Sequence, residues 1–93
     1  MSTITQAHIF VEGRGDARLG SEVVRALHPE FSAQPNPPRI EVHPIVGHWP
    51  TDMFAYAYTA LRAHHGLALT TTNCLLQDGS AYGKRLYMVY VKE

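Results

Sequence analysis

Carboxylates stand at two places where an apolar run of the chain ends, and they are the side chains best suited to chemistry. Glu12 follows the apolar run that ends at Val11, and Asp16 comes soon after it. Asp78 follows a second apolar run that contains Leu75 and Leu76. Carboxylates can act as general acids or bases, and their oxygens can bind Mg²⁺. If both runs are strands that end at the same sheet edge, Glu12 and Asp78 could meet there.

The segment around Glu12 resembles the first motif of the Toprim domain of topoisomerases, primases and related nucleases. In that family an apolar strand runs into Val-Glu-Gly and, after two further residues, Asp; here these are Val11-Glu12-Gly13 and Asp16. The second Toprim motif, Asp-x-Asp-x-x-Gly, is matched in part from Asp78 to Gly83, with Ser80 in place of the second acid. The resemblance implies Mg²⁺-dependent phosphodiester chemistry, with Glu12 as the acid or base and Asp78 and Asp16 as metal ligands.

Plain structural roles are an alternative for the same residues. Glu12 can be the polar residue that ends a strand, and Asp16 has the position of a helix N-cap. Asp78-Gly79 between two strand-like runs is typical of a hairpin turn. None of these roles requires a metal ion.

Histidine and cysteine form a weaker chemical pattern. His43, His48, His64 and His65 raise the question of zinc, but they show no His-x-x-x-His spacing on a helix and no Cys-x-x-Cys pair accompanies them. We therefore expect surface histidines and no cofactor, apart from the Mg²⁺ of the Toprim-like alternative. Cys74, the single cysteine, lies within an apolar run, which predicts a small buried thiol.

Composition favours a binding protein over an enzyme. The chain has 8 Lys plus Arg and 8 Asp plus Glu, so its balanced charge offers no overall field to attract nucleic acid. We expect a non-catalytic module that acts by protein–protein contact, such as an inhibitor or regulator of nucleic-acid-handling (nucleoprotein) machinery, with any direct nucleic-acid contact confined to a local patch. The expected contact residues are Arg14, Arg18, Trp49, Tyr56, Tyr82, Lys84, Arg85 and Tyr87.

The cellular setting expected from the sequence is the cytoplasm, without membrane contact. One cysteine cannot form an internal disulfide, and the N-terminal residues lack the pattern of a signal peptide. No apolar run approaches the ~18 residues that a membrane-spanning helix needs.

A single domain over 1–93 must position these side chains. Ile4–Val11 is apolar and rich in β-branched residues, which predicts a strand. Asp16 is then expected to cap an amphipathic helix that ends before Pro29. Four prolines within 29–38 predict an extended internal loop.

The segment Arg39–Val46 predicts a half-exposed strand. Ile40 and Val42 would face the core, and Glu41 and His43 would face solvent. Pro44, within this segment, indicates an edge strand.

A second helix is expected after Thr51, which has the character of an N-cap, and before Gly66, which suits a helix C-terminus. Leu67–Gln77 and Arg85–Lys92 predict two strands, and the turn lies within 78–84. The apolar stripe expected on the second helix is Phe54, Ala57, Tyr58 and Leu61.

The predicted fold class is α/β (α+β), with the element order β-α-β-α-β-β. We expect a mixed four-stranded sheet, two helices packed on one face of it, and a C-terminal antiparallel hairpin. This order is similar to that of the Alba nucleic-acid-binding dimers, a further alternative for the function. An uncovered edge, either Arg85–Lys92 or the strand with Pro44, could form a homodimer.

Overall fold

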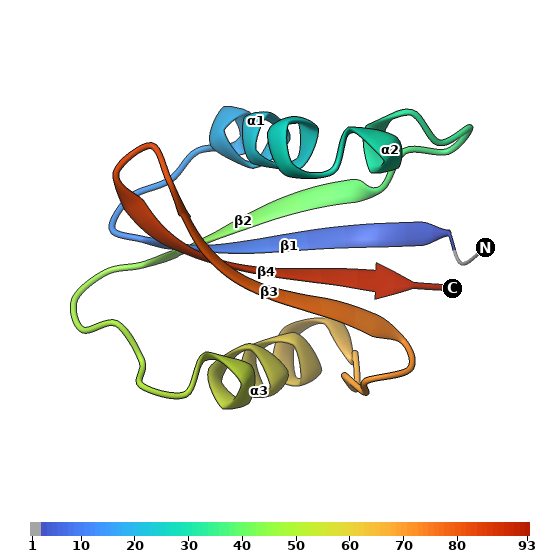
Figure 1. Cartoon of the computed structure of the whole chain (residues 1–93). Coiled ribbons are helices and arrows are strands. Elements are labelled where there is room, and N and C mark those ends of the chain that lie inside the picture. Colours follow the sequence, from blue (N-terminus) through green and yellow to red (C-terminus); the bar gives the residue numbers. More distant parts are fainter. Residues whose placement is uncertain (1–2) are drawn as a thin grey trace.

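The computed structural model describes residues 3–93, which form one mixed sheet with helices on it (Figure 1). The predicted fold class is confirmed, including the C-terminal antiparallel hairpin. Thr3 and Glu93 lie side by side, since the Glu93 backbone N–H donates to the Thr3 carbonyl at 2.9 Å. The elements are β1 (Ile4–Glu12), α1 (Ala17–Leu27), α2 (Pro29–Ser32), β2 (Arg39–Ile45), α3 (Met53–His65), β3 (Cys74–Ala81) and β4 (Lys84–Lys92).

The strand order is β2-β1-β4-β3, so β1 and β4 are central. β1 pairs in parallel with β2 and antiparallel with β4, and β4 pairs antiparallel with β3. β1, β2 and β3 therefore run in the same direction, while β4 runs against them. The expectation that Arg85–Lys92 is an edge is wrong, because this segment belongs to the central strand β4. β2, which contains Pro44, is an edge as predicted.

The helices cover both faces of the sheet, rather than one face as predicted (Figure 1). On one face, Val23 of α1 packs with Ile9 of β1. On the other face, Leu61 of α3 packs with Phe10 of β1. The reason lies in β1, where all residues from 7 to 11 are buried. Since successive side chains of a strand point to opposite faces, such a strand needs a covering layer on each side.

Both long helices begin at an aspartate. Asp16 accepts a hydrogen bond from the Leu19 N–H at 2.9 Å, as predicted for an N-cap. The cap of α3 is Asp52, which accepts from the Ala55 N–H at 3.0 Å, and not the predicted Thr51. None of the helices within residues 3–93 combines the length and apolar character that crossing a membrane requires.

The buried stripe of α3 includes the predicted Ala57 and Leu61, but it begins at Met53 and not at Phe54, and Tyr58 is only partly buried. Met53, Ala57 and Leu61 are buried at intervals of four, whereas Phe54 is 40% exposed. A shift of one residue turns a side chain by about 100° around a helix, which explains the exposure of Phe54. The same periodicity brings His65 to the sheet side of the last turn.

Part of the proline-rich segment is helical and not extended. Pro29–Ser32 forms α2, with proline at the start of the helix. This position suits proline, because the first N–H groups of a helix have no partner within it. Only the remainder of 29–38 is irregular.

The hairpin turn lies at Tyr82-Gly83, within the predicted segment 78–84 but not at Asp78-Gly79. Tyr82 and Gly83 have φ values of 57° and 73°, the positive values that a two-residue hairpin turn of type I′ requires. Asp78 therefore lies within β3, opposite Tyr87. The predicted strand Leu67–Gln77 begins only at Cys74, since the residues before it form a loop and turn.

Gly20 lies at the contact between α1 and β2, so a substitution at this position tests that contact. A Cβ atom at Gly20 would lie 2.6 Å from Val42 Cγ2 and 2.9 Å from Ile40 Cγ2. Because these branched side chains belong to a paired strand and cannot move freely, Gly20→Ala should lower the free energy of unfolding by about 1–3 kcal/mol in chemical denaturation, despite the better helix propensity of alanine. Glu22→Ala, on the exposed side of α1, is the control and should change it by less than about 0.5 kcal/mol. A Gly20→Ala protein as stable as the wild type would contradict this packing.

Candidate metal centre

The parallel register of β1 and β2 gathers three polar side chains on the face that α3 covers. His8 lies opposite Glu41, and Phe10 lies opposite His43. Because alternate residues of a strand share a face, and paired residues share it too, His8, Glu41 and His43 lie on the Phe10 side. Glu41 and His43 thus lie on the face opposite Ile40 and Val42, as predicted, but this face is partly covered, since the His43 and Glu41 side chains are 22% and 37% exposed.

A fourth polar side chain comes from the end of α3. His65 is the last residue of this helix and follows the buried Leu61 by one turn. Gly66, in the left-handed conformation with φ 66°, ends the helix there as predicted. His65 is half-buried, while its neighbour His64 is exposed on another side of the helix.

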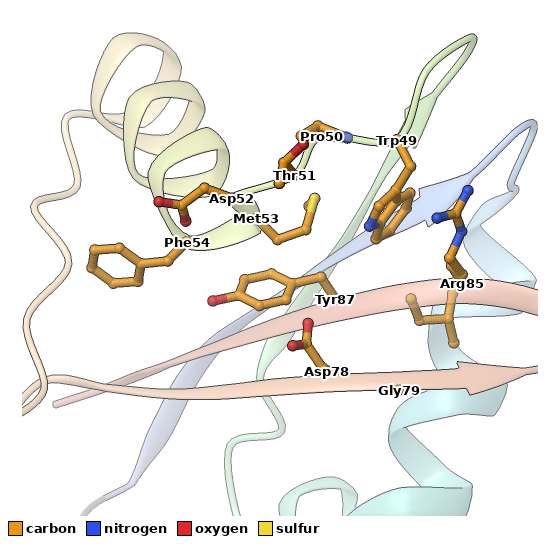
Figure 2. A pocket seen from close by; sticks show the side chains of 11 residues that line it. Trp49, Pro50, Thr51, Asp52, Met53, Phe54, Asp78, Gly79, Arg85 and Tyr87 are labelled. Atoms are coloured by element: carbon orange, nitrogen blue, oxygen red, sulfur yellow. The ribbon is translucent and has the colours of Figure 1, made fainter.

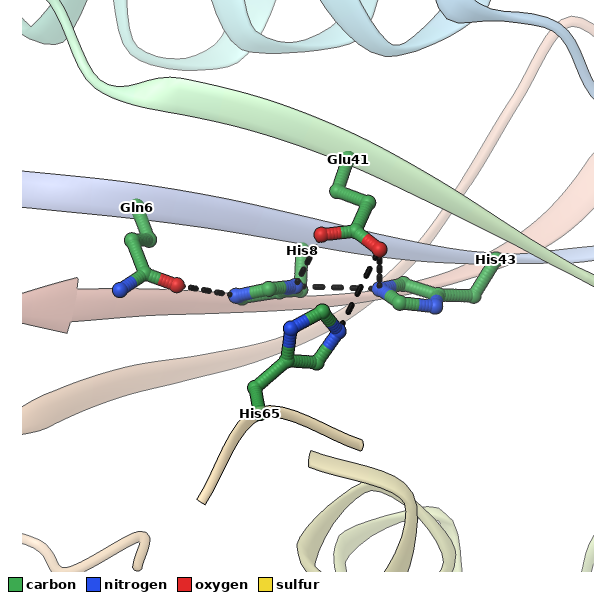
Figure 3. A network of polar contacts seen from close by, with 5 residues as sticks. All are labelled: Gln6, His8, Glu41, His43 and His65. Carbon is green, nitrogen blue, oxygen red and sulfur yellow. Dashed lines mark hydrogen bonds and ion pairs between the residues drawn. The ribbon is translucent and has the colours of Figure 1, made fainter. Parts of the chain in front are cut away.

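One ligand atom from each of His8, Glu41, His43 and His65 lies within 4.8 Å of the others (Figure 3). His8 Nδ1 is 3.0 Å from His43 Nε2, and Glu41 Oε1 is 3.3 Å from His65 Nε2. Glu41 Oε2 is 3.9 Å from His8 Nδ1. A tetrahedral ion with ligands at about 2.0–2.1 Å would separate its ligand atoms by about 3.3 Å. The observed spacings bracket this value.

Gln6 orients the His8 ring. His8 Nε2 lies 2.8 Å from Gln6 Oε1, so a neutral His8 donates its Nε2–H to the Gln6 carbonyl oxygen (Figure 3). The lone pair of His8 is then on Nδ1, the atom that faces the other three side chains. Metal-binding histidines are commonly held by such a hydrogen bond on their second nitrogen.

Burial keeps the His8 and His43 imidazoles neutral. His8 is fully buried, and this burial, with His43 nearby, lowers the pKa of His8 to about 4, although the Glu41 carboxylate acts in the opposite direction. Burial also lowers the pKa of His43. Neutral imidazole is the form that binds a metal ion, so at neutral pH no proton has to leave His8 before a metal ion enters.

Three imidazoles and one carboxylate could hold a metal ion. This donor set suits zinc and related transition metals, whereas Mg²⁺ prefers oxygen ligands alone. The ligands come from a central strand, an edge strand and a helix end, and the Glu41, His43 and His65 side chains are between 22% and 37% exposed. The cluster is thus anchored in the core at His8 and open to solvent on its other side.

Sequence patterns missed this cluster, although local signals for it exist. Of the histidines whose spacing raises the question of zinc, only His43 and His65 belong to the cluster, and the other two, His48 and His64, are exposed. The third histidine of the cluster, His8, has no such signal. The spacing Glu-x-His in β2 places two donors on one face, and His65 follows the α3 stripe. The missing information was the register between β1 and β2.

The residues of the Toprim-like motifs take up separate positions. Glu12 accepts a hydrogen bond from Arg85 Nε at 2.8 Å, which lowers the pKa of the Glu12 carboxyl group. Asp16 caps α1, and Asp78 lies on β3 with β4 between it and β1. The backbones of β1 and β3 are therefore about 10 Å apart. Within residues 3–93, Glu12, Asp16 and Asp78 do not form a group with the spacing of metal ligands.

The predicted contact residues gather in two hollows on the surface, with one exception. Tyr56 lies apart, on α3, with its ring edge against Phe10 at 5.9 Å between centroids. The larger hollow is a cleft between α3 and the hairpin, and Trp49, Arg85 and Tyr87 are among its lining residues (Figure 2). The smaller hollow, at the start of α1, is lined by residues that include Arg14, Arg18, Tyr82 and Lys84.

Cys74 is buried, as predicted. Its thiol donates a hydrogen bond to the Thr70 carbonyl oxygen at 2.8 Å. Burial raises the pKa of this thiol, which disfavours the reactive thiolate.

No match was found for this chain among models of known protein families, among curated proteins or among solved structures. Its candidate functions therefore rest on the geometry of its own residues.

His8 makes the stability of the metal-free protein depend on pH. Its pKa is 6.5 when exposed in the unfolded chain and about 4 in the folded protein, so between these values only the unfolded chain binds the proton. The free energy of unfolding should be highest above pH 6.5. It should fall by up to about 3 kcal/mol as the pH decreases towards 4.

Denaturation of the chelator-treated protein at a series of pH values measures this effect. His8→Gln should flatten the dependence in this range, whereas His48→Gln, which changes an exposed histidine, should retain it. Equal slopes for His8→Gln and the wild type would show that His8 does not titrate as its burial requires.

Proposed function

We propose that this protein binds a divalent transition-metal ion of the zinc class through His8, Glu41, His43 and His65. The observation that carries this proposal is the convergence of four donor atoms within 4.8 Å, from three separate elements, around a buried histidine. Gln6 already directs the Nδ1 lone pair of His8 into the cluster. A buried imidazole costs free energy unless its nitrogens are paired, and a metal ion could take the place of His43 as the partner of His8 Nδ1.

The bound ion would join the sheet to the helix layer. His8 belongs to β1, Glu41 and His43 belong to β2, and His65 ends α3. A metal ion that binds only the folded chain adds its binding free energy to folding, about 2.7 kcal/mol when the free ion is at 100 times its Kd. The ion would thus hold the C-terminal end of α3 against the sheet.

Calorimetric titration with Zn²⁺ should show one ion per chain. Gln6→Ala should weaken affinity by about 10–100-fold, because it frees the His8 ring without removing a ligand. His43→Ala should weaken affinity further, since it removes a ligand. Zn²⁺ should also raise the melting temperature of the wild type.

His48→Ala and His64→Ala are the matched controls, because both histidines lie outside the cluster. Neither variant should change the affinity by more than about twofold. Zinc binding that survives His43→Ala but is lost in His64→Ala would refute the assignment of ligands. A wild-type protein without saturable binding of Zn²⁺, Co²⁺ or Ni²⁺ would refute the proposed function itself.

Contact with a protein or nucleoprotein partner remains a second proposal, supported by the two hollows that gather the predicted aromatic and basic side chains.

The Toprim-like alternative requires a shared Mg²⁺ site for Glu12, Asp16 and Asp78. If such a site had a Kd near 1 mM, about 10 mM Mg²⁺ would add about 1.4 kcal/mol to stability.

We expect no such stabilisation by Mg²⁺, because Arg85 pairs with Glu12 and β4 separates Glu12 from Asp78. Thermal denaturation with and without Mg²⁺ measures it. A rise in the melting temperature that disappears in both Glu12→Ala and Asp78→Ala would instead support the Toprim-like chemistry.

A further inference from the structure

We propose that the cleft between α3 and the hairpin binds an organic cation, a guanidinium, amidinium or ammonium group on an apolar body. This cleft has a volume of about 680 Å³. Pockets that hold small ligands typically measure about 300–1,000 Å³. The cleft is lined by Trp49, Pro50, Thr51, Asp52, Met53, Phe54, Asp78, Gly79, Arg85, Leu86 and Tyr87.

Aromatic rings form the walls of the cleft. Figure 2 shows Trp49 on one side, Phe54 on the other, and the Tyr87 ring between them. Tyr87 is only 5% exposed and forms the rigid floor of the cleft. Phe54 is 40% exposed, because Met53 takes the inward position on α3. Aromatic faces attract cations through their negative π surface, and Phe54 and Tyr87 can offer theirs to a ligand, whereas the Trp49 ring already carries the Arg85 guanidinium.

The charges of the cleft leave an excess of negative charge. Arg85 is the only basic residue in its lining, and it is engaged by Glu12 Oε2 at 2.8 Å and by the Trp49 ring, 5.2 Å from the ring centroid. The lining also holds two carboxylates, Asp52 and Asp78. Within the part of the chain that the structure describes, neither of them forms an ion pair.

The two carboxylates flank the same ring from opposite sides. Asp52 comes from the start of α3 and Asp78 from β3, and the Tyr87 ring lies between them (Figure 2). The pKa of the Tyr87 hydroxyl is raised, first by burial and then by the negative charge of Asp78, with a smaller effect of Asp52. Asp52 uses one oxygen to cap α3, while Asp78 has its carboxylate available for a charge-assisted hydrogen bond. An anion would meet repulsion here.

This binding site is independent of the metal centre. The cleft lies at the N-terminal end of α3 and the metal centre at its C-terminal end, and a helix of 13 residues is about 20 Å long. The two sites share no residue. A failed test of one therefore leaves the other standing.

Benzamidine, a planar amidinium, is the first probe, and neutral benzamide is its matched control. Binding is followed by calorimetry and by the fluorescence of Trp49, the only tryptophan of the chain. We expect saturable binding of one benzamidine and at least tenfold weaker binding of benzamide, about 1.4 kcal/mol. A second arm uses N-acetylarginine amide, which presents the same chemistry as a peptide side chain would. Binding of either cation supports the site. Tighter binding of benzamidine indicates a small-molecule ligand, and tighter binding of N-acetylarginine amide indicates an arginine side chain of a peptide.

Asp78→Asn removes one charge without altering the shape of the cleft, and it should weaken cation binding about tenfold. Glu22→Gln makes the same charge change on α1, outside the cleft, and should leave binding unchanged. Zinc binding should be equal in all three proteins. Equal affinity for benzamidine and benzamide, equal affinity of wild type and Asp78→Asn, or the absence of any binding of both cations in calorimetry would each overturn the proposal.

Discussion

The burial of His8 in the central strand is the constraint on which the rest of the structure depends. A polar ring in the middle of a core loses its contacts with water, and this loss costs free energy unless its nitrogens find partners. Gln6 and His43 supply those partners at 2.8 Å and 3.0 Å. Gln6 is available because it lies two residues before His8 on the same face of β1, and His43 is available because β2 pairs with β1 in parallel. The proposed metal centre is therefore part of the packing of the sheet, and not an addition to its surface.

A single helix stripe connects the two proposed sites. Met53, Ala57 and Leu61 hold α3 on the sheet. One turn beyond Leu61, the same stripe brings His65 to the metal centre, and its first residue, Met53, leaves Phe54 exposed in the cleft. The proposed metal centre and the proposed cation site share no residue, but the same few apolar contacts of α3 position both of them.

Local patterns in the sequence predict the elements but not their arrangement. β1, the Asp16 cap and the Gly66 helix end follow from periodicity and capping rules. The placement of α3 on the opposite face from α1, and the pairing of His8 with Glu41, depend on contacts between residues more than 30 positions apart. The Asp78-Gly79 turn prediction failed for a related reason, because pairing with β4 extends β3 to Ala81 and moves the turn to Tyr82-Gly83.

Nuclear magnetic resonance of the histidine ring nitrogens during titration with Zn²⁺ tests the central claim most directly, since it reports each ring nitrogen separately. The metal centre requires that Zn²⁺ shift Nδ1 of His8 and Nε2 of His43 and His65, while Nε2 of His8 stays protonated on Gln6. The rings of His48 and His64 should be unaffected. Coordination of His8 through Nε2, or shifts confined to the exposed histidines, would contradict the metal centre.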